Sequence, residues 1–284
     1  MREATRNGRP ALSVPIVVID ARHPAAGTVA EAWRRRELLF FLVWRDLKVR
    51  YKQTALGVTW AVLQPLATMV VFSIFFGRLA KMPSDGVPYP LFAFTALVPW
   101  TYFAGALAQG SNALLTSQAL VSKVYFPRML LPLASVVTPL VDAGIGLVVL
   151  GSLSVWYGHL PGMAIVWLPA FALLAVATAF GVVLFLAALN VVYRDVRYVL
   201  PFLTQIWLFA TPVAYPASLL PEQWRWIYAL NPMVSVIEGF RWALLGTTVL
   251  DAPMLAASVS ASAFAVVLGV WYFRRLETTF ADVI

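Results

Sequence analysis

Long apolar runs separated by short polar segments dominate the chain from residue 57 onward. Six of these runs reach the roughly 20 residues that a helix needs to cross a hydrocarbon core about 30 Å thick. They cover approximately residues 57–77, 89–111, 130–156, 163–189, 198–217 and 253–273. The pattern predicts an all-α integral membrane protein with six transmembrane helices per subunit, in a membrane domain over residues 53–284.

An amphipathic helix is predicted before the first span, over residues 31–52. Its apolar side chains recur three, four or seven residues apart, at Trp33, Phe40, Trp44, Leu47 and Tyr51. Cations follow another side, at Arg45, Lys48 and Lys52. Tryptophan suits the headgroup layer and cations suit anionic lipid, so we expect the helix to lie at the membrane interface. Residues 1–30 are expected to form a cytosolic extension, because Pro15 interrupts their apolar run and argues against a secretion signal.

The stretch over residues 224–250 is apolar enough to suggest a seventh span. A seventh span would place Asn231, Pro232, Glu238 and Arg241 deep in the membrane. Two short helices over residues 224–246 that enter the outer leaflet and return fit better, with their bend at Asn231 and Pro232. Glu238 and Arg241, three residues apart, are expected to form an ion pair there.

Composition and charge agree with a membrane protein. Apolar residues make up 61% of the chain and charged residues 12%, far from the averages for soluble domains. With both termini in the cytosol, seventeen of the 21 Lys and Arg residues lie on that side, and the other four are Arg78, Lys81, Arg225 and Arg241. This asymmetry predicts cytosolic termini. The net charge of +8 could suggest a nucleic-acid partner, but the cations flank the membrane segments, which argues against one.

The sequence lacks the motifs of common catalytic and nucleotide sites. The phosphate loop GxxxxGK[ST], the dinucleotide fingerprint, HExxH and GxSxG are all absent. There is no cysteine, and the only histidines are His23 and His159, so a metal site is not expected. We therefore predict no catalytic residue, metal or cofactor in this chain. A membrane-embedded glycosyl- or phosphotransferase would need a carboxylate pair or metal cluster, and Asp142, Asp195 and Glu238 are too dispersed to supply one.

Asp142 is the one carboxylate expected deep in a span. Ionisable residues inside a membrane are functional candidates by default, so a proton-coupled porter that uses Asp142 is one hypothesis. The other is a structural role, hydrogen bonded to Ser135, Thr138 or a neighbouring helix. The structural role is favoured because a proton relay normally needs a second buried titratable partner.

A short mixed segment separates the second and third spans, and we call residues 117–128 the coupling segment. Its polar residues prevent it from crossing a membrane, and its apolar residues cover one side of a helix of two to three turns that the proline ends. Such a helix can fit a groove in a soluble partner or rest on lipid headgroups, and both interpretations stay open. The candidate residues are Ser117, Gln118, Ala119, Leu120, Val121, Ser122, Lys123, Val124, Tyr125, Phe126, Pro127 and Arg128.

Two spans contain aromatic and polar residues at helical spacing. In the first span these are Trp60, Gln64, Thr68, Phe72 and Phe75, and in the fifth they are Phe202, Gln205, Phe209 and Tyr215. Such faces could line a conduit in which rings contact sugars and amides meet hydroxyls. Helix packing or lipid contact is the alternative. The two glutamines favour a lining, since an amide facing lipid would lack a partner.

Five blocks, in this order, resemble one family of transporters: RELLFFLVWRDLKVRYKQTALGVTWAVLQPL, LVPWTYFAGAL, SQALVSKVYFPRMLLPL, NVVYRDVRYVLPFLTQIWLFATPVAYP and WIYALNPMVSVIEGFRWALLG. They resemble the membrane subunit of type-2 ATP-binding-cassette exporters for lipid-linked polysaccharide. This family comprises the Wzm-like permeases of O-antigen export and their teichoic-acid and capsule relatives.

The resemblance implies a homodimer in the bacterial inner membrane, with two copies of a separate ATPase subunit that binds Mg-ATP. It implies that residues 117–128 couple the ATPase to a channel for an undecaprenyl-diphosphate-linked glycan. Arg45, Lys48 and Arg50 are then expected to attract the diphosphate, although binding of lipid headgroups explains these cations equally well. A small-molecule efflux permease would share the same architecture. The amino-terminal extension is longer than in many relatives, so the resemblance leaves the role of residues 1–27 open.

Overall fold

A computed structural model describes residues 35–52, 57, 59–123, 126–247 and 250–280. The predicted extension over residues 1–30, the first residues of the predicted amphipathic helix, and Val124 and Tyr125 lie outside the described residues. Within the described ranges the chain is helical and contains no strand. The elements are α2 (Arg36–Lys52), α3 (Thr59–Phe72), η1 (Ser73–Leu79), α4 (Tyr89–Gly110), α5 (Ala113–Thr116), α6 (Gln118–Lys123), α7 (Leu130–Val137), α8 (Pro139–Trp156), η2 (Met163–Trp167), α9 (Leu168–Val192), α10 (Val196–Phe209), η3 (Ala217–Leu219), α11 (Glu222–Ala229), α12 (Pro232–Leu245) and α13 (Ala252–Glu277).

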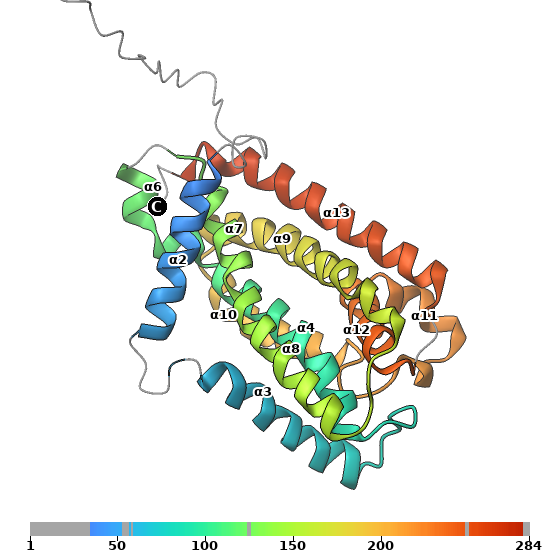
Figure 1. Ribbon diagram of the computed structural model, residues 1–284. Helices are drawn as coiled ribbons and strands as arrows, with labels where there is room; N and C mark the ends of the chain where they lie inside the picture. Colours follow the sequence, from blue (N-terminus) through green and yellow to red (C-terminus); the bar gives the residue numbers. More distant parts are fainter. Residues whose placement is uncertain (1–34, 53–56, 58, 124–125, 248–249, 281–284) are drawn as a thin grey trace, which may run out of the picture.

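Five helical segments are long and apolar enough to cross a membrane. They are Thr59–Leu79, Tyr89–Gly110, Leu130–Trp156, Met163–Val192 and Ala252–Glu277, and their bounds coincide closely with five of the six predicted spans. In Figure 1 their helices run along one diagonal, with α6 and the C-terminus near one end of the bundle and α11 and α12 near the other.

The predicted span over residues 198–217 is shorter than expected. Helix α10 ends at Phe209 and the chain then turns. The helical prediction is therefore wrong beyond Phe209. Pro212 and Pro216 explain the stop, because a proline disfavours helical geometry in the residue before it and lacks the N–H of a helical hydrogen bond. Fourteen residues rise roughly 21 Å, less than the thickness of a hydrocarbon core.

Helix α4 forms the centre of the bundle. In its most apolar 18-residue stretch, 78% is buried inside the protein, whereas the corresponding share is 11% for Thr59–Leu79 and 17% for Ala252–Glu277. Helices α9 and α13 pack with their backbones in close approach, since a Cβ placed on Gly269 would lie 2.2 Å from the carbonyl oxygen of Gly181. The hydroxyl of Thr178 also donates to Ser262 across this contact, at 3.0 Å.

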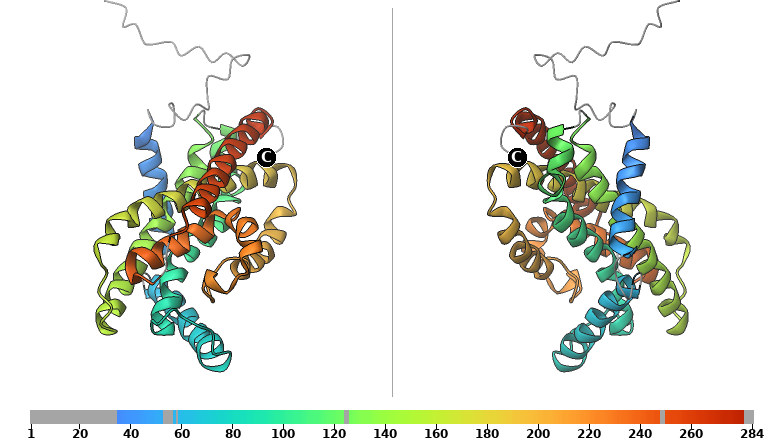
Figure 2. Two further views of the ribbon diagram at one scale, coloured as in Figure 1. Left: turned by 90° about the vertical axis from the view of Figure 1, so that its right-hand side faces the viewer. Right: turned by 90° about the vertical axis from the view of Figure 1, so that its left-hand side faces the viewer.

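Helix α2 crosses the bundle near the end where α6 lies (Figures 1 and 2). Leu42 is buried against α7 and its neighbours. Phe40 and Phe41 are more than half exposed, and Trp44 is half exposed. The aliphatic side of this helix packs against the third span, with Leu38, Leu39 and Val43 partly buried in the same cluster. The exposed aromatic side chains leave its predicted place at the membrane interface open.

Helices α11 and α12 are two short helices that meet at Asn231 and Pro232, where the sequence places the bend. Asn231 caps α12 by accepting a hydrogen bond from the Met233 N–H, at 3.2 Å. Gly246 ends α12 with a φ of +66°, which glycine adopts without steric cost. Their depth in the outer leaflet stays a prediction.

Candidate functional site

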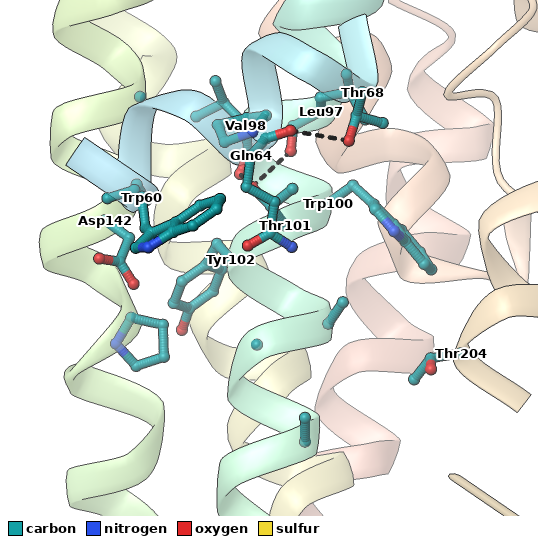
Figure 3. Close-up of a pocket in the computed structure, with 18 of the residues that line it drawn as sticks. Trp60, Gln64, Thr68, Leu97, Val98, Trp100, Thr101, Tyr102, Asp142 and Thr204 are labelled. Carbon is teal, nitrogen blue, oxygen red and sulfur yellow. Dashed lines mark hydrogen bonds between the residues drawn. The ribbon is translucent and has the colours of Figure 1, made fainter. Parts of the chain in front are cut away.

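A cleft of about 770 Å³ opens between α3, α4, α8 and α10, near the end of α2. Figure 3 shows Trp60 and Gln64 of α3, Thr101 and Tyr102 of α4, and Asp142 of α8 around this cavity, with Thr204 on α10 opposite. Small residues on two helices, among them Ala104, Gly105 and Ala143, keep it open. The sequence therefore builds a wide cleft with mixed polar and aromatic walls.

The α3 wall agrees with the predicted lining for three of five residues. Trp60, Gln64 and Thr68 line the cleft. Phe72 instead is buried in the core against Phe76, and Phe75 is exposed outside the cleft. Each four-residue step turns about 40° around a helix, so Phe72 lies about 120° around α3 from Trp60 and faces the core instead. A role of these residues in lining a channel stays a prediction.

The α10 wall uses a different face from the predicted one. Leu200, Pro201 and Thr204 line the cleft, whereas Phe202, Gln205 and Phe209 are exposed and point elsewhere. Neighbouring residues on a helix are about 100° apart, so the predicted face was rotated by that angle.

Tyr215 does not belong to this face either, because it follows the end of α10. Its hydroxyl donates to the carbonyl of Phe209 at 2.7 Å and lies 2.8 Å from the hydroxyl of Tyr228. Tyr215 therefore fixes the turn after α10 to α11.

The α4 wall was missed by sequence reasoning. Leu97, Thr101, Gly105 and Ala108 follow each other at three- or four-residue spacing and all line the cleft. A stripe of small and hydroxyl residues on an otherwise bulky helix was the available signal.

Asp142 joins the cleft to the amphipathic helix. Its carboxylate forms an ion pair with Arg50 of α2 at 2.5 Å and accepts a hydrogen bond from the Tyr51 hydroxyl. Burial raises the pKa of Tyr51 to about 12, and the hydrogen bond to Asp142 acts in the same direction, so the hydroxyl keeps its proton at neutral pH. Ser135 and Thr138 bond to carbonyls of their own helix turns instead. Of the two hypotheses for Asp142, this geometry matches the structural one, with a neighbouring helix as the partner.

The other two predicted diphosphate cations lie outside the cleft. Arg45 pairs with Asp46 at 2.9 Å, and the ammonium of Lys48 lies over the ring of Trp44, 5.4 Å from its centroid. Only Arg50 of the three lines the cleft.

The described residues of the coupling segment comprise the six-residue helix α6 and, from Phe126 to Arg128, a non-helical stretch that ends in a turn. Val121 and Phe126 are buried in a cluster that includes Phe273 and Phe280, and the guanidinium of Arg128 donates to the carbonyl of Glu277 at the end of α13. Gln118 and Ala119 are exposed, and Leu120 is half-buried. The segment therefore has one side fixed to the protein and one side facing outward.

The predicted ion pair is present near the opposite end of the bundle. Arg241 Nη1 lies 2.9 Å from Glu238 Oε1. Arg241 is fully buried and also donates to the carbonyls of Val213, at 3.0 Å, and Tyr215, at 3.4 Å. Its guanidinium carbon lies 3.6 Å from the ring centroid of Phe92. These contacts join α12 to α4 and to the turn after α10.

The described part of the chain contains no group of three acidic or histidine side chains placed to hold a metal.

Comparison with known proteins identifies one family over most of the chain. Residues 37–245 match the family described as ABC-2 type transporter. The chain is 33% identical over 237 residues to an O-antigen export system permease protein of Myxococcus xanthus, covering 82% of this chain and 90% of that protein. It is 27% identical over 249 residues to a Klebsiella pneumoniae protein with the same description, covering 87% and 95%. A polysialic acid transport protein of Escherichia coli is 24% identical over 216 residues, covering 71% and 78%.

Proposed function

The chain belongs to the ABC-2 type transporter family, and on this basis we propose that it is the membrane subunit of an ATP-driven exporter. The proposed cargo is an undecaprenyl-diphosphate-linked polysaccharide of the O-antigen class, moved across the bacterial inner membrane. The O-antigen export permeases that match over most of their own length support this assignment.

The energy comes from a separate subunit in this proposal. The sequence contains no phosphate loop, so two copies of an ATPase that binds Mg-ATP would dock on the outward side of the coupling segment. The exposed Gln118 and Ala119 offer that surface. Because Val121 and Phe126 are fixed in the cluster with Phe273, a push on α6 would be transmitted into the bundle.

The observation that carries the proposal is the cleft, which we interpret as half of a channel. Its walls α3 and α10 expose Trp60, Phe202 and Phe209 on the surface of the single chain. A second copy that covers these faces would close the cleft into a conduit and account for the exposed Phe202 and Phe209, which lie outside the cavity of the single chain. Rings and hydroxyls in such a conduit suit the apolar faces and hydroxyls of sugars.

The proposed topology has six spans with both termini cytosolic. Helix α10 and the turn after it, supported by α11 and α12 from the outer leaflet, take the place of the fifth span. Helix α2 lies at the cytosolic interface, with Phe40 and Trp44 in the headgroup layer.

A small-molecule efflux permease is the second candidate. A volume of about 770 Å³ falls within the range of drug-binding pockets. Transport of lipid-linked glycan and of small cationic dyes by the same vesicles separates the two candidates.

Reconstitution with candidate ATPase subunits and a lipid-linked polysaccharide tests the proposal. The wild-type chain should co-purify with one ATPase, stimulate its hydrolysis and export the glycan, and it should hydrolyse no ATP alone. Ala119→Asp should leave the fold intact, because the side chain is exposed, and lower stimulated hydrolysis at least about tenfold, since a carboxylate would be buried at the docking surface. Ala252→Asp, at an exposed alanine near the other end of the bundle, is the matched control. Transport that persists with no nucleotide-binding partner would contradict the proposal.

A further inference from the structure

The turn between α8 and η2 exposes several large apolar side chains, and we call residues 156–167 the outer tip. Trp156 is 83% exposed and Met163 is 88% exposed. The other mostly exposed apolar residues of the outer tip are Leu160, Val166 and Trp167. Figure 2 shows this turn, in yellow-green, at the lower end of the molecule and on the outside of the bundle. An exposed apolar patch of this kind marks a surface for a protein partner or for lipid.

The charge pattern favours lipid over a soluble protein. No lysine, arginine, aspartate or glutamate occurs between Asp142 and Arg194, so the outer tip and the two helices that carry it contribute no charged side chain to its surroundings. A surface that docks a soluble protein normally has a polar rim around its apolar centre. Tryptophan, which stands at both ends of the outer tip, prefers the headgroup layer of a membrane.

The backbone of the outer tip is suited to an environment with little water. The N–H groups of Tyr157, Gly158 and His159 donate to carbonyls in the last turn of α8, and the N–H of Ile165 donates to Gly162. The ring nitrogen Nδ1 of His159 lies 3.0 Å from the carbonyl oxygen of Tyr157. Bonds of this kind inside the chain are required wherever lipid replaces water as the surroundings.

The lengths of the two helical segments place the outer tip beyond an upright span. Leu130–Trp156 has 27 residues and Met163–Val192 has 30, which rise roughly 40 and 45 Å, whereas a hydrocarbon core is about 30 Å thick. Arg128 and Arg194 adjoin their other ends and mark the cytosolic interface. The surplus therefore falls at the outer tip, and tilting of the helices is the usual way to bring such a surplus back into the membrane.

The base of the outer tip is fixed to α12. Phe171, in the first turn of α9, is buried, and a Cβ placed on Gly239 would lie 2.2 Å from its ring. The rings of Phe171 and Trp242 also meet edge to face, with centroids 6.3 Å apart. Packing this close holds the start of α9 against α12, so the exposed side chains of the outer tip are presented by a rigid base.

We propose that the outer tip is a lipid-binding surface that lies in the outer leaflet, with Trp156 and Trp167 in the headgroup layer and Met163 among the acyl chains. The connection between the third and fourth spans then stays within the membrane. The inference uses the proposed topology only to name the leaflet, and it is independent of the cargo.

Site-directed spin labelling measures where the outer tip lies. The chain contains no cysteine, so Met163→Cys takes a nitroxide label at that position alone. The labelled full chain is placed in nanodiscs of phosphatidylcholine and phosphatidylglycerol. Relaxation of the label by oxygen, which concentrates in hydrocarbon, is compared with its relaxation by a nickel chelate that stays in water. Val148→Cys, at an exposed position within α8, is the lipid reference. Pro83→Cys, at an exposed position between Lys81 and Asp85, is the water reference at the same end of the bundle.

The ratio of oxygen to nickel accessibility at position 163 should exceed the ratio at position 83 severalfold and approach the ratio at position 148. A ratio equal to that at position 83 would place the outer tip in water and overturn the proposal. Low accessibility to both reagents would show that protein covers the outer tip, as a second copy of the chain would, and would overturn it equally. The measurement needs neither an ATPase subunit nor a glycan, so its outcome is separate from that of the transport assay.

Discussion

Replacing the buried Arg241 with methionine should strongly destabilise the protein. Arg241 has no exposed surface, and its guanidinium contacts the Glu238 carboxylate, two backbone carbonyls and the ring of Phe92. Methionine has a similar length and can still pack on Phe92. The variant Arg241→Met therefore removes the charge and its donors with little loss of volume.

The cost follows from what is left behind. Glu238, itself only 14% exposed in its side chain, loses its counter-charge, and the carbonyls of Val213 and Tyr215 lose a donor. Removing one member of a buried ion pair typically costs about 3–5 kcal/mol. A glutamate can take up a proton, so we expect the lower end, about 3 kcal/mol. Glu238→Gln should cost about 4 kcal/mol, because an arginine left alone cannot lose its proton.

Unfolding by sodium dodecyl sulfate in mixed micelles, followed by tryptophan fluorescence, measures these free energies. The double variant Glu238→Gln with Arg241→Met leaves no buried charge, so its loss should be smaller than the sum of the single losses by about 2 kcal/mol. Arg225→Met, at an exposed arginine on α11, is the control and should change stability by less than about 0.5 kcal/mol. A loss under about 1 kcal/mol for Arg241→Met, or additive single losses, would refute the reasoning.

Two further variants test other contacts. Gly269→Ala should lower the free energy of unfolding by more than about 2 kcal/mol in the same titration, because its Cβ would meet the Gly181 carbonyl oxygen at 2.2 Å and force α9 and α13 apart. Gly151→Ala is the control. It has open space around it and should leave stability unchanged or raise it by roughly 0.5 kcal/mol. Asp142→Asn should lower the free energy of unfolding by about 1 kcal/mol, since its ion pair is partly exposed. ATP-driven export by this reconstituted variant should persist, also after a protonophore collapses the proton gradient. Loss of export by a variant that folds normally would favour the proton-coupled porter.

The long apolar helices could be predicted from the sequence because their signal is local. An apolar run of sufficient length defines its own ends, as Tyr89–Gly110 and Leu130–Trp156 show. The pair of Glu238 and Arg241 was equally accessible, since residues three apart meet on any helix. The predicted helix of the fifth span ends too late, because Pro212 and Pro216 stop the helix although the hydrophobic pattern continues.

The cleft could be predicted only in part because it depends on how helices rotate against each other. Periodicity identified polar residues on α3 and α10, but which face of α10 turns inward is set by packing against α4 and α9. The contact of Asp142 with Tyr51 joins residues 91 positions apart. No local pattern encodes such a partner, and the same is true of the contact between Arg128 and the end of α13.

The burial of α4 has a consequence for membrane insertion during translation. Tyr89–Gly110 has the lowest mean hydropathy of the five long segments, 1.5, and the largest buried share. Its residues are thus selected to fit neighbours that are translated later, α8, α9 and α12, more than to dissolve in lipid. During synthesis this segment is the least suited of the five to partition into the bilayer unaided. The helices that bury it are available only after the downstream half of the chain has been translated.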